Sequence, residues 1–224
     1  MAEVLVLVEH VDGTPKKVTL ELLTLARSLG EPSAVFVGSG YDNAKAQLAE
    51  YGAQKVYVAG DAELDSYVVA PKAEVLAQIA GSASPAAILI ASSPEGKEVA
   101  GRLAVKLDSG VITDAVGVED GFVAHQSIFG GAFNVKSSVG KGTPIITVRP
   151  NSTAPEAAAA TPSEEQVSVS LSEAATKAKI VESVSEKKGG RPELTEASIV
   201  VSGGRGLGGA EHFELIEKLA DSLG

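Results

Sequence analysis

A glycine-rich segment near the end of the chain carries the residue types best suited to chemistry. Gly204, Gly206 and Gly209 fit the spacing G-x-G-x-x-G. Between a strand and a helix, glycines at this spacing let backbone N–H groups approach a diphosphate at the positive end of the helix. Arg205 stands inside the segment, and its planar guanidinium can hold two phosphate oxygens at once. The pattern is compatible with an anion site at Gly204 and Arg205 and equally with a plain tight turn that carries a solvated arginine, so the motif alone does not establish dinucleotide binding.

Other residues that could do chemistry are isolated from one another. His10, His125 and His212 have no second histidine or carboxylate at the helical spacing of a metal site, so we expect structural roles for them and no metal centre. Ser92 and Ser93 precede Pro94, which is typical of a helix N-cap, at an edge where α/β proteins also bind ligands. Without a G-x-S-x-G elbow, the sequence predicts no serine hydrolase chemistry and no catalytic residue.

The elements that must position these residues alternate along the first half of the chain. The aliphatic run Val4–Val8 predicts a strand that is buried on both faces. Further strands are expected at 34–37, 55–59 and 86–90, with helices at 18–29, 43–50, 70–80 and 94–107. This alternation predicts βαβ units and therefore an α/β fold, with a mostly parallel sheet and helices on both of its faces.

After residue 107 the pattern becomes that of antiparallel strands. Asp120-Gly121 stands between two short apolar segments, at 116–119 and 122–126, and is a strong hairpin signal. Strands are also expected at 133–138 and 145–148. The sheet is therefore predicted to gain an antiparallel edge.

The rest of the chain is expected to contain a surface connection and the first elements of a second domain. Residues 151–162 are rich in alanine and proline and predict a surface connection, while 167–171 alternate as in a strand. Residues 186–192 form a polar boundary. A strand at 198–201, the glycine turn and an apolar helix pattern then predict the first strand-turn-helix of a second α/β domain. We expect domains at 1–190 and 191–224, the second incomplete because segments below about 40 residues rarely fold alone.

Composition excludes several classes of protein. The chain has 224 residues, no cysteine, and 19 Lys and Arg against 29 Asp and Glu, for a formal charge of −10. Without cysteine there is no disulfide, thiolate metal site or cysteine nucleophile. The acidic balance argues against nucleic-acid binding. The apolar runs are far shorter than the roughly 20 residues of a spanning helix, and the N-terminus is unlike a signal peptide, so we expect a cytoplasmic protein without membrane insertion.

One long motif resembles a known family. The segment from Arg191 to Leu207 reads R-P-x-L-T-x-A-x-I-V-V-S-G-G-R-G-L and closely resembles the electron transfer flavoprotein alpha subunit. Residues 103–107 and Thr113-Asp114 resemble the same family more weakly, and the likeness extends over the whole chain. In that family the chain continues beyond the position of Gly224, so we expect this one to be truncated.

The resemblance implies a function. It implies an electron carrier rather than an enzyme, and a heterodimer with a beta subunit that binds AMP. A nucleotide-binding-like N-terminal domain without a redox cofactor would precede an FAD-binding C-terminal domain. The flavin would take electrons from flavin dehydrogenases, such as acyl-CoA dehydrogenases of fatty acid beta-oxidation, and pass them to a membrane quinone oxidoreductase. By position Arg205, with Gly204 beside it, matches a family FAD contact. Because the other contacts lie beyond Gly224, we expect this chain alone not to retain FAD. In a eukaryote the location would be the mitochondrial matrix.

Two other hypotheses stay open on the residues themselves. The N-terminal domain could bind an adenine nucleotide as a regulatory module, although its first strand is followed by only one glycine, Gly13, rather than a glycine loop. Alternatively, the chain could be an assembly surface that docks a beta subunit through sheet edges and loops.

Overall fold

The structure is a computed structural model, and it describes residues 2–184, 190–194 and 196–223. The chain divides into two compact units, residues 1–183 and 184–224, and each is described by itself. The boundary segment expected at 186–192 lies partly outside the described residues.

The first unit is built on one sheet, which has nine strands in the described part of the chain, in the order β11-β5-β4-β1-β6-β10-β7-β8-β9. Neighbouring strands from β11 to β7 run parallel, and β8 and β9 extend the sheet antiparallel. In chain order the strands are β1 (Glu3–Leu7), β4 (Glu31–Val37), β5 (Lys55–Ala59), β6 (Ala87–Ala91), β7 (Val111–Glu119), β8 (Val123–Ile128), β9 (Phe133–Ser137), β10 (Ile145–Val148) and β11 (Ser163–Gln166). The predicted parallel sheet with an antiparallel edge is confirmed.

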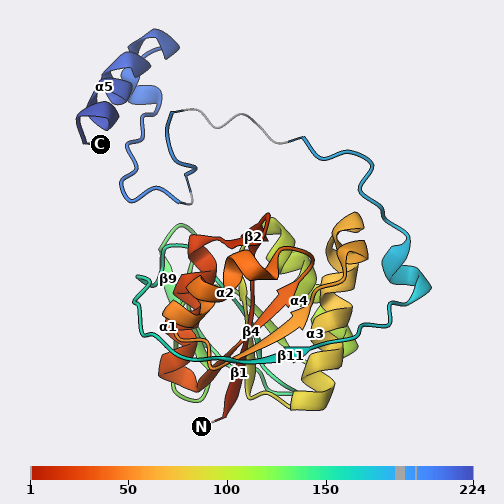
Figure 1. Ribbon diagram of the computed structural model, residues 1–224. Helices are drawn as coiled ribbons and strands as arrows, with labels where there is room; N and C mark the ends of the chain where they lie inside the picture. The colour runs from red at the N-terminus through yellow and green to blue at the C-terminus, as the bar shows by residue number, and fades with distance from the viewer. Residues whose placement is uncertain (1, 185–189, 195, 224) are drawn as a thin grey trace. The chain divides into compact units, whose positions relative to one another are not determined.

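Helices cover both faces of this sheet, as predicted (Figure 1). Along β1, Val4 and Val6 point to one core cluster and Leu5 and Leu7 to the other, because successive side chains of a strand face opposite ways. The first cluster packs against α1 (Lys17–Leu29) and α2 (Tyr41–Glu50), and the second against α3 (Val69–Ala83) and α4 (Pro94–Lys106). Short strands β2 (His10–Val11) and β3 (Thr14–Pro15) form a separate hairpin, and a 3₁₀ turn, η1 (Ala62–Ser66), precedes α3.

The strand expected at 167–171 was placed too late in the sequence. The strand is β11, residues Ser163–Gln166, which pairs with β5 from Lys55 to Val58. The Val167 N–H still donates to the Val58 carbonyl at 2.9 Å, and β5 then ends at Ala59, so the ladder with β5 does not continue through 167–171. Val167, Val169 and Leu171 instead pack their side chains against the second core cluster.

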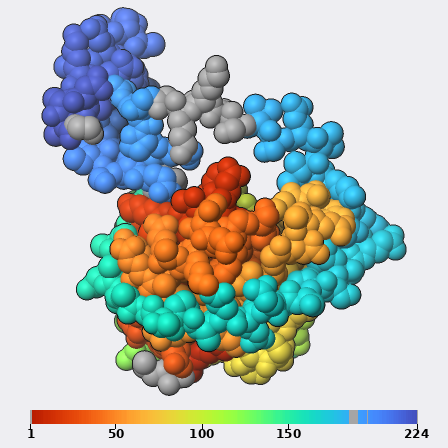
Figure 2. Space-filling view, in the orientation of Figure 1, coloured from red at the N-terminus to blue at the C-terminus, as the bar shows by residue number. Residues whose placement is uncertain are grey.

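Residues 151–180 run along the outside of the first unit (Figure 2). Three backbone hydrogen bonds attach this segment to the unit before β11 begins. Ala158 and Ala160 donate to carbonyls at the end of α2, and Ser163 donates to the Gln54 carbonyl. A 3₁₀ turn, η2 (Glu173–Thr176), follows β11. The Ala/Pro-rich stretch 151–162 is thus a surface connection with specific backbone contacts.

The second unit contains 3₁₀ turns η3 (Arg205–Leu207) and η4 (Ala210–His212) and then helix α5 (Phe213–Leu223). The prediction of a strand at 198–201 is wrong, because the described residues of this unit form no strand. A β-strand needs a hydrogen-bonded neighbour, and this unit offers no second strand in its described part. Ile199 and Val200 are therefore 57% and 55% exposed.

Candidate functional site

The glycine turn of the second unit is a compact, hydrogen-bonded loop. The Leu207 N–H donates to the Gly204 carbonyl at 3.0 Å, and the Gly208 N–H donates to the Arg205 carbonyl at 3.1 Å. Gly208 has a φ of +83°, a left-handed conformation that glycine adopts without strain. His212 Nδ1 lies 2.6 Å from the Leu207 carbonyl oxygen and closes the loop on its far side.

The glycines of this turn serve different purposes. A Cβ at Gly203 would lie 2.4 Å from Leu207 Cδ1 and 3.1 Å from Ile216 Cγ1, so close packing within the unit requires this glycine. A Cβ at Gly204 or Gly206 would meet nothing within 4 Å. At these two positions the missing side chain leaves open space next to the backbone, which is the space that a bound group would need.

Arg205 is exposed in the open part of this turn. Within the described residues its guanidinium has no hydrogen bond or ion pair. Arg191, in the same unit, differs, because it donates to Asp221 Oδ1 at 2.6 Å and to the Glu217 carbonyl at 3.4 Å. An arginine whose five donors are uncommitted is available to an anionic ligand.

The helix does not follow the glycine turn as directly as the G-x-G-x-x-G spacing suggests. Helix α5 begins at Phe213, and η4 stands between it and Gly209. Arg205 is therefore in a 3₁₀ turn rather than at the helix N-terminus. Its action on an anion would come from the guanidinium and the glycine backbone, with no contribution from a helix dipole at that position.

An apolar groove of about 420 Å³ lies in the same unit, between the segment 190–201 and α5. Ile199, Val200 and Val201 line one side, and Ile216, Ala220 and Leu223 line the other. The apolar residues that were expected to form a strand thus face the helix instead.

The carboxyl edge of the sheet in the first unit holds an acidic side chain. Glu9 follows β1, its carboxylate accepts a hydrogen bond from the Ser93 hydroxyl, and it lies 3.6 Å from the Lys16 ammonium. Ser93 Oγ also accepts the Gly96 N–H at 2.9 Å and so caps α4, with Pro94 in the first turn. The predicted capping role of Ser93 is confirmed. A protein carboxylate already occupies this helix N-terminus, where nucleotide-binding α/β domains place a phosphate.

A second polar network lies beside it. The Thr147 hydroxyl donates to Ser92 Oγ at 3.1 Å and accepts the Asp114 N–H at 3.0 Å. Asp114 in turn accepts two hydrogen bonds from Arg149, at 3.2 Å and 2.6 Å. The Arg149 guanidinium holds the pKa of the Asp114 carboxyl below its usual range, against the opposing effect of burial. These groups satisfy one another, which is typical of a structural network.

The three histidines have local partners. His10 stacks on Phe36 with ring centroids 4.3 Å apart, while Nε2 lies 3.0 Å from the Val37 carbonyl and Nδ1 accepts the Gly13 N–H. His125 Nε2 lies 2.9 Å from a Glu119 carboxylate oxygen. In the described part of the chain no group of three potential metal ligands comes together.

Sequence inspection missed Glu9 and Glu74. Glu9 could have been found, because it directly follows the first buried strand and so stands at the carboxyl edge. Glu74 lies on α3, and its partner Ser172 is 98 residues away, so no local pattern connects the two.

An α/β sheet unit followed by a small unit with an arginine-bearing glycine turn is an arrangement that could hold a nucleotide cofactor. Comparison with known families makes this specific: the family described as "Electron transfer flavoprotein domain" matches residues 4–177, and "Electron transfer flavoprotein FAD-binding domain" matches residues 193–224. The glycine turn thus falls in the FAD-binding match.

Curated relatives agree with these family matches. Over all of its length the chain is 48% identical to the electron transfer flavoprotein subunit alpha of Mycobacterium leprae and 51% identical to that of Mycobacterium tuberculosis, and it covers 71% of each. It is 36% identical to the subunit alpha of Syntrophomonas wolfei, of which it covers 72%. The chain belongs to the electron transfer flavoprotein alpha subunit family.

Proposed function

We propose that the chain serves as the alpha subunit of a heterodimeric, FAD-containing electron carrier. It would accept electrons from flavin dehydrogenases, such as the acyl-CoA dehydrogenases of fatty acid beta-oxidation, and pass them to a membrane quinone oxidoreductase. It would act as a carrier rather than a substrate-converting enzyme, in the cytoplasm. The observation that supports this most directly is the uncommitted guanidinium of Arg205 in the segment that matches the FAD-binding domain.

The glycine turn fits the diphosphate of FAD. Arg205 would hold phosphate oxygens through its fork of donors, and Gly204 would let the backbone approach them, because no neighbouring atom fills the space around its α-carbon. The bound flavin supplies the redox chemistry, while the chain supplies binding and orientation. FAD is the cofactor of the complete protein in this proposal.

The same proposal assigns the parts of the chain. Residues 1–190 would be the nucleotide-binding-like domain, with 151–162 as a connection, and 191–224 would begin the FAD-binding domain. The division into units at residues 183 and 184 and the separate family matches support this assignment. The partner would be a beta subunit carrying AMP. No helix in the described residues is both long and apolar enough to span a bilayer. In this proposal, electrons reach the membrane oxidoreductase by docking.

The alternative of an adenine-nucleotide module in the first unit is less well supported. A nucleotide phosphate at the N-terminus of α4 would meet the Glu9 carboxylate, which already accepts the Ser93 hydroxyl. Two negative charges at one site repel each other. The Glu9 carboxylate at this edge of the sheet therefore disfavours the binding of a nucleotide phosphate.

Electron acceptance tests the proposed function directly. The alpha and beta chains are purified together and mixed with a flavin dehydrogenase and its substrate in the absence of oxygen. The proposal predicts that the visible flavin absorption of the heterodimer bleaches only when dehydrogenase and substrate are both present. A heterodimer whose flavin stays oxidised under these conditions contradicts it.

A further inference from the structure

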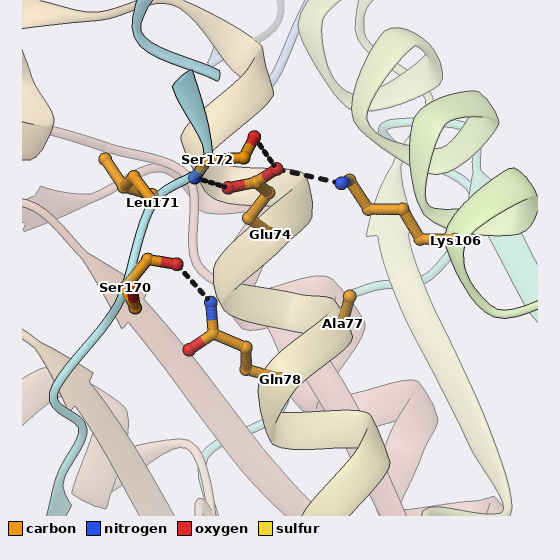
Figure 3. Close-up of a pocket in the computed structure, with 7 residues that line it drawn as sticks. All are labelled: Glu74, Ala77, Gln78, Lys106, Ser170, Leu171 and Ser172. Carbon is orange, nitrogen blue, oxygen red and sulfur yellow. Dashed lines mark hydrogen bonds and ion pairs between the residues drawn. The ribbon is translucent and has the colours of Figure 1, made fainter. Parts of the chain in front are cut away.

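Glu74 of α3 binds a segment of the chain that is remote in sequence. Its side chain is largely buried, with the residue 8% exposed. The Ser172 N–H donates to Glu74 Oε2 at 2.8 Å, and the Ser172 hydroxyl donates to Oε1 at 2.6 Å. The Lys106 ammonium of α4 donates to Oε1 at 2.9 Å (Figure 3). One carboxylate therefore ties two helices to the returning chain.

Residues 167–180, which we call the strap, also contact the first unit elsewhere: apolar side chains of 167–171 pack against the second core cluster, the Val167 N–H donates to the Val58 carbonyl at 2.9 Å, and Lys179 forms a β-bridge with Tyr67. The Gln78 amide donates to the Ser170 carbonyl at 3.1 Å, and the Ile180 N–H donates to the Ser66 carbonyl at 2.9 Å. Ala175 is 3% exposed. Among the hydrogen bonds of the strap, those to Glu74 are the strongest, because hydrogen bonds to a charged, shielded group exceed those between neutral groups.

We propose that Glu74 is a positioning residue that holds the strap on α3 and α4 and thereby fixes where the chain leaves the first unit. With the strap held, the last backbone hydrogen bond to the first unit among the described residues is that of Ile180. Without it, the last backbone hydrogen bond to the rest of the first unit among the described residues is the one from the Val167 N–H to the Val58 carbonyl, next to the end of β11.

The point at which the chain leaves the first unit sets the length of free chain that connects it to the second unit. Release of the strap would add about fourteen residues of chain, or roughly 45–50 Å when extended. The effective concentration of one tethered unit near another falls steeply as the tether lengthens. Under the proposed function, on which this consequence rests, Glu74 would keep the FAD-binding part within a limited range. The positioning itself does not depend on flavin.

Hydrogen exchange followed by mass spectrometry tests the hold on the strap. Glu74→Gln removes the charge and weakens the Ser172 and Lys106 contacts. Glu98→Gln is the matched control, because Glu98 also pairs with a cation, Arg102 at 2.8 Å, but is half exposed and makes no hydrogen bond to the described residues of the strap. We expect amides of 167–180 to exchange about tenfold faster in Glu74→Gln and to be unchanged in Glu98→Gln, while β1 and β6 stay protected in both.

A second variant and a distance measurement keep the test independent of one substitution. Ser172→Ala should loosen the same amides, and the effect in the double variant should be less than the sum of the two single effects, because both substitutions weaken the hydrogen bond between the Ser172 hydroxyl and Glu74. The chain has no cysteine, so spin labels can be placed after Asp120→Cys and Ser222→Cys. The distribution of distances between them should broaden with Glu74→Gln and stay unchanged with Glu98→Gln.

Wild-type exchange of the strap and an unaltered distance distribution in Glu74→Gln would overturn the proposal. So would faster exchange spread equally over β1 and β6, since that would show general destabilisation. Neither measurement uses flavin, so a negative result for the strap would not bear on the proposed electron carriage. A heterodimer without flavin would likewise not change the outcome of these two measurements.

Discussion

The Ser93 hydroxyl joins the carboxylate of Glu9 to the N-terminus of α4. It donates to Glu9 and accepts the Gly96 N–H at 2.9 Å. Because a carboxylate is favoured at the positive end of a helix, this contact stabilises both the helix start and the buried edge of the sheet. The unit thus supplies its own anion at the place where related architectures bind one from solution.

Adenine nucleotides should bind poorly to the first unit for this reason. Calorimetric titration of the chain with AMP or ATP should give no saturable heat up to about 1 mM, the range of very weak binding. Glu9→Gln, which removes the charge but keeps an acceptor, serves as the comparison. Micromolar affinity of the unaltered chain would instead support the regulatory-module hypothesis.

Loss of the Ser93 hydroxyl should destabilise the first unit. Ser93→Ala removes the cap of α4 and leaves Glu9 without its hydroxyl donor, so we expect a loss of about 1–2 kcal/mol in the free energy of unfolding. Urea denaturation measures this value. Ser82→Ala is the control, because the Ser82 hydroxyl only returns to the Ile79 carbonyl of its own helix. Equal stability of the two variants would argue against the cap.

The glycine turn makes a prediction that separates folding from cofactor binding. Gly204→Ala should leave the free chain folded, because the new methyl group meets nothing within 4 Å and the φ of −142° suits alanine. In the heterodimer it should weaken FAD retention by roughly tenfold, since the methyl group occupies the space a diphosphate needs. Gly140→Ala, at an equally open position in the first unit, is the control. Equal flavin retention in both variants would count against the turn as a diphosphate site.

The stabilisation that the hydrogen bonds between Ser172 and Glu74 provide should depend on pH. Burial by itself raises the pKa of the Glu74 carboxyl, but the Ser172 hydroxyl and N–H and the Lys106 ammonium outweigh burial and hold the pKa below its usual 4.5. A lowered folded-state pKa means that the stabilisation is fully present above pH 4.5 and is lost as pH falls through the folded-state value. The difference in unfolding free energy between the unaltered chain and Glu74→Gln should therefore shrink below pH 4.5. Arg102 and Lys106 line the adjoining pocket and are the cationic residues beside Glu74 there. A difference in unfolding free energy that stays constant down to pH 3 would contradict a stabilising role for the ionised Glu74 carboxylate.

Much of the first unit could be predicted because its signals are local. Continuous aliphatic runs such as Val4–Val8 identify buried parallel strands, and Asp120-Gly121 identifies the β7–β8 hairpin. The Ser93 cap was equally visible, since the serine, the proline and the first helical turn are adjacent.

The errors arose where structure depends on partners remote in sequence. Whether 163–166 or 167–171 forms the last strand is decided by the register of the chain against β5, which places Ser163 opposite Lys55, and the alternating pattern of 167–171 carries no information on that register. Ile199 and Val200 have strong β propensity but no strand to pair with in the described residues, so tertiary context decides against them. Arg205 was found through its motif. Its uncommitted guanidinium became visible only in the structure.

Flavin retention after substitution of Arg205 tests the central claim most directly. The heterodimer of the whole alpha subunit with its beta subunit is dialysed, and the ratio of flavin absorption to protein is measured for the unaltered protein, Arg205→Ala and the control Arg102→Ala. Because a charge-assisted hydrogen bond contributes about 1.5–3 kcal/mol, FAD should bind roughly 10–100-fold more weakly to Arg205→Ala, and the control should keep its flavin. Full retention of flavin by Arg205→Ala would contradict the account.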